Sequence, residues 1–299
     1  MQIITELEKI PDLSLALGYF DGVHKAHKIV IQSAVNFAYE NNTKSAVVTF
    51  TDHPCCYFWD VAPKYILTRK IREEKIAALG VDYLIELDFK SISVLTAEEY
   101  LKDILIKYFS PSAISTGYNH YFGCKKSGNV KYLEQNAEQF GYRYLRLDRQ
   151  TLNNEVISST TIRKLLELGH IEKANDMLGY NFSITGEVIT GQKIGRTIGF
   201  RTANLVYPPE LIELPYGVYS SNVILGDKIY HGITNFGMRP TVNGKSALIE
   251  VHIFDFNKDI YGQNITVEFN KMIRPEQKFA SLSNLKQQIH KDIMNIKSA

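Results

Sequence analysis

Cysteine is scarce in this sequence: there are three in 299 residues, and two of them, Cys55 and Cys56, are neighbours. Adjacent cysteines rarely bridge, and so few cysteines cannot form a disulfide framework. An excess of one charge is also lacking, because 34 lysines and arginines balance 32 acidic residues without a run of like charge. The composition therefore predicts reduced thiols and argues against nucleic acid as a partner.

Long hydrophobic runs are missing as well. No stretch reaches the roughly 20 apolar residues that span a bilayer, and residues 1–18 carry acids and a proline where a targeting segment has a basic and then an apolar part. We therefore expect a cytoplasmic protein without a membrane partner, and the sequence leaves its oligomeric state open. What is present is an ordinary globular composition, 44 % hydrophobic and 22 % charged, with a length sufficient for two domains.

The first half of the chain alternates short apolar runs with helical patterns, the order typical of an α/β domain with a parallel sheet. Apolar runs at 15–18, 46–50 and 83–87 predict strands. Thr96 and Glu99 have the spacing of a capping box, which predicts a helix that begins near Ala97.

A further helix is expected to begin at Ser159 or Thr160 and to end at Gly169. From about Phe182 onward, short β-rich runs are separated by glycine, proline or asparagine, a pattern that favours a small antiparallel barrel. Apolar residues at helical spacing after Ser281 predict one amphipathic helix on that barrel. We therefore predict two domains, 1–182 and 183–299.

The segment GYFDGVHKAHK at 18–28 lies between the first expected strand of the sheet and its helix. In a parallel sheet, phosphates bind at this place, where the helix N-terminus offers free N–H groups. His24 and His27 share one helical face and can both donate hydrogen bonds to a polyphosphate. Two alternatives remain open: histidines that face solvent, and a zinc site formed with His53 and a cysteine.

Residues 14–28 resemble the nucleotidyltransferase superfamily, and specifically the GxFDGVHxGH form of bacterial riboflavin kinase/FAD synthetases. Three further segments match the same family in order: TFTDHP at 49–54, GYNHYFG at 117–123 and ISSTTIR at 157–163. The resemblance implies a Rossmann-like domain that transfers AMP from ATP to FMN and releases pyrophosphate. The catalytic positions that it implies here are His24, His27 and Arg163. The implied ATP-binding positions are Gly18, Phe20, Asp21, His24, His27, Ser158, Ser159, Thr160 and Arg163, and the implied flavin-binding positions are His53 and Asn119.

The glycine-rich segment at 191–205 lacks the GK[ST] of a Walker loop. It resembles the riboflavin kinase motif GxxxGRxxGFPTANL, which implies an ATP site in the second domain. The positions implied for ATP are Gly191, Gly195, Arg196, Gly199, Thr202 and Asn204, of which Thr202 and Asn204 also hold Mg²⁺. A hydroxyl and an amide oxygen are suitable ligands for this cation.

Glu250 lies in the apolar segment LIEVHIFDF, where alternation puts its carboxylate on one face with Leu248, Phe254 and Phe256. From position alone, Glu250 could be an edge-strand residue that reaches solvent. The resemblance makes it the general base that accepts the proton of the riboflavin 5′-hydroxyl. The resemblance also implies flavin-binding roles for Arg274, Glu276 and Phe279, for which surface roles are the alternative.

Four positions depart from the family pattern. Ala26 replaces the glycine between the two histidines, His120 and Tyr121 replace Phe and Arg, and Arg201 replaces a proline. Over residues 14–292, the resemblance implies a bifunctional transferase that uses ATP and Mg²⁺ to convert riboflavin to FMN and FMN to FAD. The departures keep two alternatives open: a paralogue with only one activity, and a flavin- or nucleotide-sensing protein without turnover.

Overall fold

The computed structural model of the chain describes residues 1–53, 57, 64–191, 199–241 and 244–298. It forms two compact units, Met1–Ser159 and Thr160–Ala299. The units divide ahead of residue 182, where the sequence places the domain boundary. The domain bounds 1–182 and 183–299 stay a prediction.

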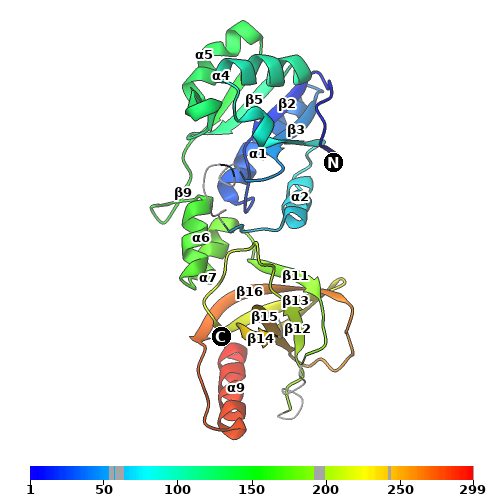
Figure 1. The fold of residues 1–299 in the computed structure, drawn as a ribbon, viewed down its shortest axis with the longest axis vertical. Helices are drawn as coiled ribbons and strands as arrows, with labels where there is room; N and C mark the ends of the chain where they lie inside the picture. Colours follow the sequence, from blue (N-terminus) through cyan, green and yellow to red (C-terminus); the bar gives the residue numbers. More distant parts are fainter. Residues whose placement is uncertain (54–56, 58–63, 192–198, 242–243, 299) are drawn as a thin grey trace. The chain divides into compact units, whose positions relative to one another are not determined.

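The first unit contains a six-stranded sheet in which all paired strands are parallel (Figure 1). In spatial order its strands are β1 (Gln2–Ile4), β4 (Tyr83–Leu87), β3 (Lys44–Phe50), β2 (Leu13–Leu17), β5 (Ala113–Gly117) and β8 (Arg143–Leu147). The strand order reverses between β2 and β5, which is the point where doubly wound sheets bind ligands beyond their carboxyl ends. The predicted α/β domain is confirmed, and the segment at 18–28 follows a strand at this point.

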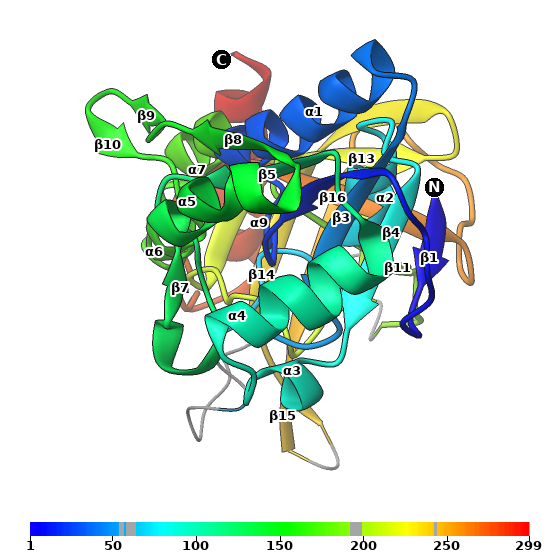
Figure 2. The ribbon, with the colours of Figure 1, turned by 90° about the horizontal axis from the view of Figure 1, so that it is seen from above.

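Helices cover both faces of this sheet, so β2 is buried along its whole length. Helix α1 (Lys25–Glu40) packs on one face, where the Ser115 hydroxyl donates to the carbonyl of Val30. On the other face, Leu13, Leu15 and Leu17 belong to a core that includes residues of the π-helix η2 (Tyr100–Phe109). Figure 2 shows α1 on one side of β2 and β3 and α4 (Ala97–Glu99) on the other.

The predicted capping box is confirmed. The Thr96 side chain accepts from the N–H of Glu99, and the Glu99 carboxylate accepts from the N–H of Thr96, at the start of α4. The helix continues into η2 and ends at Ser110, which has a left-handed conformation with φ 39°. The remaining elements of the unit are α2 (Arg69–Ala77), α3 (Phe89–Ile92), η3 (Cys124–Lys126), α5 (Val130–Phe140) and the short strands β6 (Tyr121–Phe122), β7 (Gly128–Asn129), β9 (Thr151–Leu152) and β10 (Glu155–Val156).

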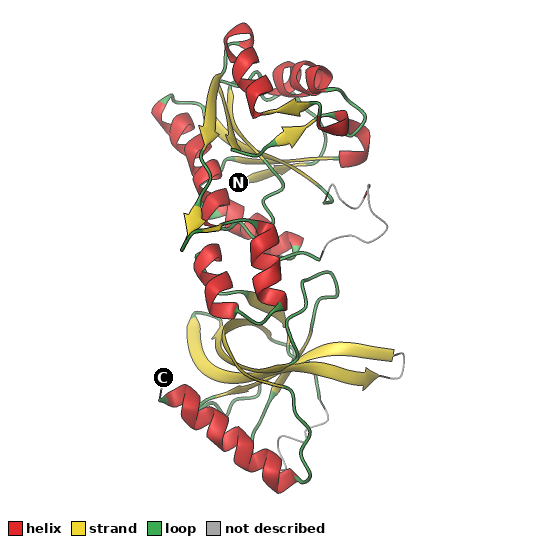
Figure 3. Ribbon diagram, turned by 90° about the vertical axis from the view of Figure 1, so that its left-hand side faces the viewer, coloured by secondary structure: helices red, strands yellow, loops and turns green. Residues whose placement is uncertain are grey.

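Helix α6 (Ser159–Glu167) begins at the predicted residue, and α7 (Ile171–Leu178) follows it. The sheet of the second unit is antiparallel throughout (Figure 3). Its strands are, in spatial order, β11 (Ser183–Glu187), β16 (Asn264–Pro275), β13 (Gly217–Leu225), β14 (Lys228–Thr241), β15 (Gly244–Ile253) and β12 (Ala203–Val206). The two outer strands approach each other, because Leu205 lies 3.4 Å from the position of a Cβ on Gly186. The sheet is therefore a nearly closed barrel, as predicted.

Large side chains fill the barrel, among them Tyr219, Phe236 and Phe269, which are fully buried. The expected C-terminal helix is α9 (Leu282–Lys297), and the Ser281 hydroxyl accepts from the N–H of Asn284 at its start. Its Ile293 and Ile296 pack against an apolar cluster on the outer face of the barrel, formed by Val218, Ile233 and Phe254. Across the described segments, no helix has both the length and the apolar composition to cross a bilayer.

Candidate active sites

The first candidate site is the loop between β2 and α1. His24 is the N-cap of α1, and its Nδ1 accepts from the backbone N–H of His27 at 3.2 Å. The two imidazole rings are stacked, with centroids 3.5 Å apart and planes at 18°. Because Nδ1 accepts, the proton of a neutral His24 ring is on Nε2, so Nε2 is the nitrogen that can donate to a ligand. The structure thus brings both predicted histidines together at the helix start.

The backbone of this loop is strained. Phe20, Gly22 and Val23 have φ values of 58°, 84° and 34°. A positive φ is unfavourable for a β-branched residue such as valine and costs on the order of 1–3 kcal/mol. Gly22 also lies close to Ile66, whose Cδ1 would be 3.0 Å from a Cβ at this position. The conformation is therefore held by its surroundings and not by local preference.

Asp21 is buried and holds three segments together. Its carboxylate accepts from the backbone N–H groups of Ile66 and Leu67 at 3.1 and 3.3 Å. Its backbone carbonyl accepts from the Ser159 hydroxyl at 2.8 Å. The ISSTTIR segment therefore meets the histidine loop through a direct hydrogen bond. The carboxylate is engaged with backbone amides, and an ATP-binding role for Asp21 stays a prediction.

The other predicted residues of this domain are placed as follows. The His53 ring lies edge-on to Tyr19, with centroids 4.6 Å apart, and burial raises the pKa of the Tyr19 phenol. Asn119 is exposed in the turn after β5, beside the switch point of the sheet.

Thr160 and Arg163 belong to α6 in the second compact unit, so their convergence with the histidines stays a prediction. Gly18 lies against the Phe20 ring, 2.9 Å from the position of a Cβ, and Ser158 directly precedes α6.

His120, which replaces a phenylalanine of the family pattern, follows Asn119 in that turn. Its Nε2 is buried without a hydrogen-bond partner among the described residues, and its ring stacks on Phe122. Burial lowers the pKa of His120 to about 4, so the ring is neutral at pH 7. The substitution therefore keeps a planar, uncharged side chain at this position.

One buried ion pair of the first unit was not predicted from the sequence. Arg72 of α2 and Glu86 of β4 are 3 % and 1 % exposed, and their side chains are 3.2 Å apart. Burial raises the pKa of Glu86 above the ordinary value for a glutamate, and the positive charges of Arg69 and Arg72 oppose the rise. The signal was a carboxylate inside the apolar strand run at 83–87.

The second candidate site lies on the outer face of the barrel. Asn204 of β12 is directly opposite Glu250 of β15, which in turn is directly opposite Asn235 of β14. Directly opposite residues of antiparallel strands point to the same face, with Cβ atoms about 5 Å apart. Asn204, Glu250 and Asn235 therefore form a polar row across three strands. Asn235, the first residue of the segment NFGMRPT at 235–241, was not among the predicted site residues.

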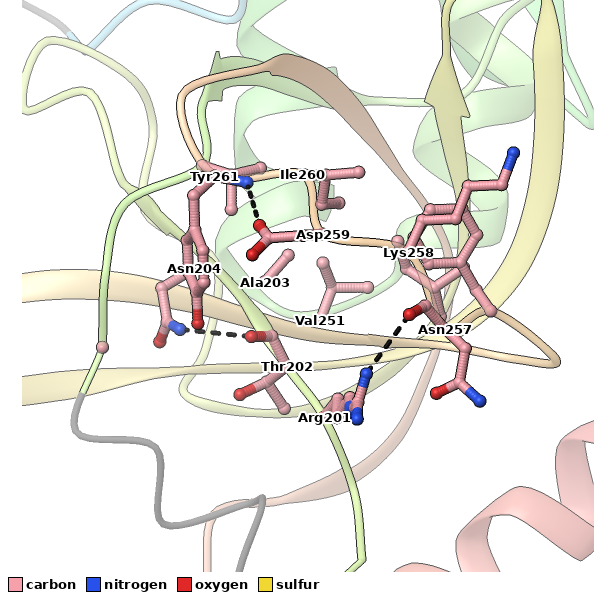
Figure 4. Close-up of a pocket in the computed structure, with 14 residues that line it drawn as sticks. Arg201, Thr202, Ala203, Asn204, Val251, Asn257, Lys258, Asp259, Ile260 and Tyr261 are labelled. Carbon is pink, nitrogen blue, oxygen red and sulfur yellow. Dashed lines mark hydrogen bonds between the residues drawn. The ribbon is translucent and has the colours of Figure 1, made fainter.

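A cavity of about 150 Å³ adjoins Asn204 (Figure 4), and Glu250 and Asn235 are not among the residues that line it. Thr202, Asn204 and Gly191 line it, and Asn204 is only 4 % exposed. The Asn204 Oδ1 is buried and has no hydrogen-bond partner among the described residues, whereas its Nδ2 donates weakly to the Thr202 carbonyl at 3.4 Å. A buried oxygen without a donor suits a hard cation such as Mg²⁺. The residues present therefore fit the predicted metal.

Arg201 lines the same cavity and is fixed at two points. Its Nη1 donates to the Asn257 carbonyl at 3.2 Å, as Figure 4 shows, and its own carbonyl accepts from Nδ1 of His252 at 2.7 Å. Proline would have fixed φ at this position. Here two hydrogen bonds hold the same stretch of chain in place of the missing ring.

The remaining predicted residues of the second site divide into three groups. Gly195 and Arg196 lie outside the described residues, and Gly199 adopts φ 90°. Arg274 donates to Asp292 of α9 at 2.9 Å and lies over the Phe279 ring at 5.6 Å. Glu276 places its Oε1 3.0 Å from the position of a Cβ on Gly237, which neighbours Asn235 at the end of the polar row.

The zinc alternative finds no support in the described part of the chain, where no three His, Cys, Asp or Glu side chains gather around a metal position. Cys55 and Cys56 lie outside that part. Cys124 is a free thiol.

Comparisons with known proteins cover both units. The family model "FAD synthetase" matches residues 7–161, and the family model "Riboflavin kinase" matches residues 178–299. The bifunctional riboflavin kinase/FMN adenylyltransferase of Haemophilus influenzae is 35 % identical over 100 % of this chain and 99 % of its own length. The Escherichia coli protein of the same name is 34 % identical over 93 % of this chain and 90 % of its own length.

A solved structure agrees with these relatives. The crystal structure of a protein described as a macrolide-efflux protein from Streptococcus pneumoniae superposes with a TM-score of 0.90 at 30 % identity, with full coverage of both chains. The relatives and the two family models together cover both sheets of the fold and both candidate sites. The chain belongs to the family of bifunctional riboflavin kinase/FMN adenylyltransferases, transferases of flavin nucleotide synthesis.

Proposed function

We propose that the chain converts riboflavin to FMN at the polar row and FMN to FAD at the histidine loop, with ATP as the co-substrate of both steps. The observation that carries the proposal is the buried Oδ1 of Asn204, which lies on a cavity without a hydrogen-bond partner in the described ranges of the chain. Asn204 is directly across the strand pair from Glu250. A metal–nucleotide position and a carboxylate are the two parts that phosphoryl transfer to a hydroxyl requires.

In the kinase step, Glu250 accepts the proton of the riboflavin 5′-hydroxyl while that oxygen attacks the γ-phosphorus of ATP. The bond from the γ-phosphorus to the bridging oxygen breaks, and ADP leaves. Thr202 and Asn204 hold Mg²⁺, which neutralises charge on the phosphates when it is bound. Gly191, Gly195, Arg196 and Gly199 contact the nucleotide, while Arg274, Glu276 and Phe279 contact the flavin.

In the adenylyl step, a phosphate oxygen of FMN attacks the α-phosphorus of ATP, and pyrophosphate leaves as the bond to the bridging oxygen breaks. His24 and His27 donate hydrogen bonds to the charge that develops, and Arg163 holds the triphosphate. The protein forms no covalent bond, so its contribution is orientation and charge stabilisation. His53 and Asn119 contact the flavin side.

The substrates are small molecules, and we infer a cytoplasmic enzyme that needs neither nucleic acid nor a membrane. Neither a single-activity paralogue nor a sensing protein is favoured, because the family models of both activities match. The name of the streptococcal structure describes transport, whereas both family models and the cited relatives concern flavin nucleotides. We therefore carry no transport role to this chain.

A product assay tests the proposal. The purified chain is incubated with ATP and MgCl₂ and with either riboflavin or FMN, and the flavins are separated by chromatography. We expect FMN and then FAD from riboflavin, FAD from FMN, and no product from either after chelation of the metal. FMN that accumulates without FAD, or FAD that forms only from supplied FMN, would reduce the enzyme to one activity. Flavin or ATP binding without any product would identify a sensing protein.

A further inference from the structure

Arg72 is a buried cation at the carboxyl edge of the parallel sheet. It lies on α2, and its only described ion-pair partner is Glu86 of β4. Burying such a pair is costly, and an apolar pair of similar volume is often as stable or more stable. Arg72 also keeps its Nε buried without a hydrogen-bond partner among the described residues, which adds to the cost. Stability of the fold alone therefore does not account for this arginine.

The remaining contacts of Arg72 reach the two loops that carry the predicted histidines. Its Nη1 donates to the Tyr19 carbonyl and its Nη2 to the Phe50 carbonyl, each at 3.4 Å. Its guanidinium carbon lies 4.5 Å from the centroid of the Tyr19 ring. Tyr19 precedes the His24 turn, and Phe50 is the last residue of β3, ahead of His53. One planar group thus joins the loop after β2, the end of β3 and the carboxylate on β4.

Arg69 provides an internal comparison, because it contacts the same carboxylate without contacting the loops. It forms ion pairs with Glu86 and Glu73, and its side chain is 52 % exposed. No described hydrogen bond joins it to the backbone at Tyr19 or Phe50. Arg69 therefore supplies charge to Glu86 as Arg72 does, and the two arginines differ in their contacts with the loops.

We propose that Arg72, neutralised by Glu86, is a positioning residue for adenylyl transfer. Its guanidinium holds the backbone at Tyr19 and Phe50, so that the histidine loop and the His53 segment keep a fixed separation around the nucleotide and the flavin. This inference rests on the proposed adenylyltransferase activity. The planar fork matters because a single ammonium cannot donate to both carbonyls and the carboxylate in the same geometry.

The test compares Arg72→Lys with the matched control Arg69→Lys in the full chain. The kcat and KM of FMN adenylylation are measured for both variants, and riboflavin phosphorylation in the same samples reports on the rest of the protein. We expect Arg72→Lys to lower kcat of adenylylation by about 10- to 100-fold, the usual effect of misplaced reacting groups. Arg69→Lys is expected to stay within about threefold, and the kinase step within about twofold, of the wild type.

A second variant keeps the inference testable if Arg72→Lys fails to fold. Glu86→Gln keeps the shape of the side chain and leaves Arg72 in place without its countercharge, so we expect a lower melting temperature of the first unit and, at temperatures where that unit is still folded, a kcat loss of about 3- to 10-fold. Equal adenylylation by wild type and Arg72→Lys, or equal losses in the two lysine variants, would overturn the inference. A wild type that makes no FAD would instead remove the adenylyltransferase proposal itself.

Discussion

The two candidate sites are assembled in different ways. The histidine loop is a turn at the carboxyl end of a parallel strand, where backbone conformation at Phe20 and Val23 decides where the side chains lie. The polar row is a set of side chains opposite one another across an antiparallel ladder, where strand register decides the same thing. A shift of one residue would turn Glu250 to the other face of β15. The first site is therefore sensitive to loop geometry, and the second to pairing.

The largest expected effect separates the chemistry of the two sites. Glu250→Gln keeps the shape and pairing of β15 and removes the proton acceptor, so we expect riboflavin phosphorylation to fall by about 10³-fold. FMN adenylylation should change by less than about twofold, since the histidine loop is untouched. Rates of both steps on the same protein sample check this. A comparable loss of FAD formation would mean that the two sites are not separate.

His27→Ala is the reciprocal change in the histidine loop. Removal of one charge-stabilising donor is expected to lower FMN adenylylation by about 10²-fold or more, and the same holds for Arg163→Ala. The kinase step serves as the internal control and should be retained in both variants. Full adenylylation by His27→Ala would exclude the imidazole from the reaction.

Gly191→Ala tests how tightly the polar row is enclosed. A Cβ at Gly191 would lie 2.6–2.8 Å from the Asn204 amide, so the amide must move, and we expect kcat/KM of the kinase to fall by about tenfold. Asn204→Ala removes the clashing group together with the predicted ligand. In that background, Gly191→Ala should have little further effect. Additive losses would show that Gly191 acts independently of Asn204.

The smallest expected effect is a pH dependence of stability in the first unit. The pKa of His120 is about 4 in the folded chain, against about 6.5 when unfolded, so below pH 6.5 the unfolded state binds the proton first. The stability present at pH 7 is therefore lost progressively as the pH falls towards 4. Relative to His120→Phe, the wild type should lose about 1 kcal/mol between pH 7 and 5.5, a few degrees in Tm. Equal changes in the Tm of the wild type and of His120→Phe over this pH range would contradict a neutral His120 ring.

Most of the fold could be predicted from local patterns. The capping box at Thr96 depends on residues three apart, and the β-rich runs after Phe182 carry their own turn residues, so each signal lies within a few positions of the element it predicts. The π-helical form of η2 could not be predicted, because its buried apolar stripe also suits an α-helix. Helix start points were therefore better determined by the sequence than helix type.

The sites were predicted in part. Both histidines and Asn204 were found through motifs, whereas the contact of Arg72 with Glu86 depends on how α2 meets β4. Tertiary contacts of this kind produce no periodic pattern in the sequence. The face proposed for Glu250 was correct for Leu248 and for Phe254, which packs with Val218 and Ile233 on the outer face of the barrel. Because β15 ends at Ile253 and Asp255 has φ 53°, the alternation stops before Phe256. The turn at Asp255 ends the alternation, and the apolar pattern of the sequence gives no sign of that turn.

The positive φ at Val23 has a consequence for how this enzyme can change over time. Glycine at that position would relax the backbone, but the Val23 side chain is fully buried. Its loss would leave a cavity that costs at least as much stability as the relieved strain provides. Mutation therefore has no easy route out of the strained turn beside the two imidazoles, because packing and backbone conformation make opposite demands on one residue.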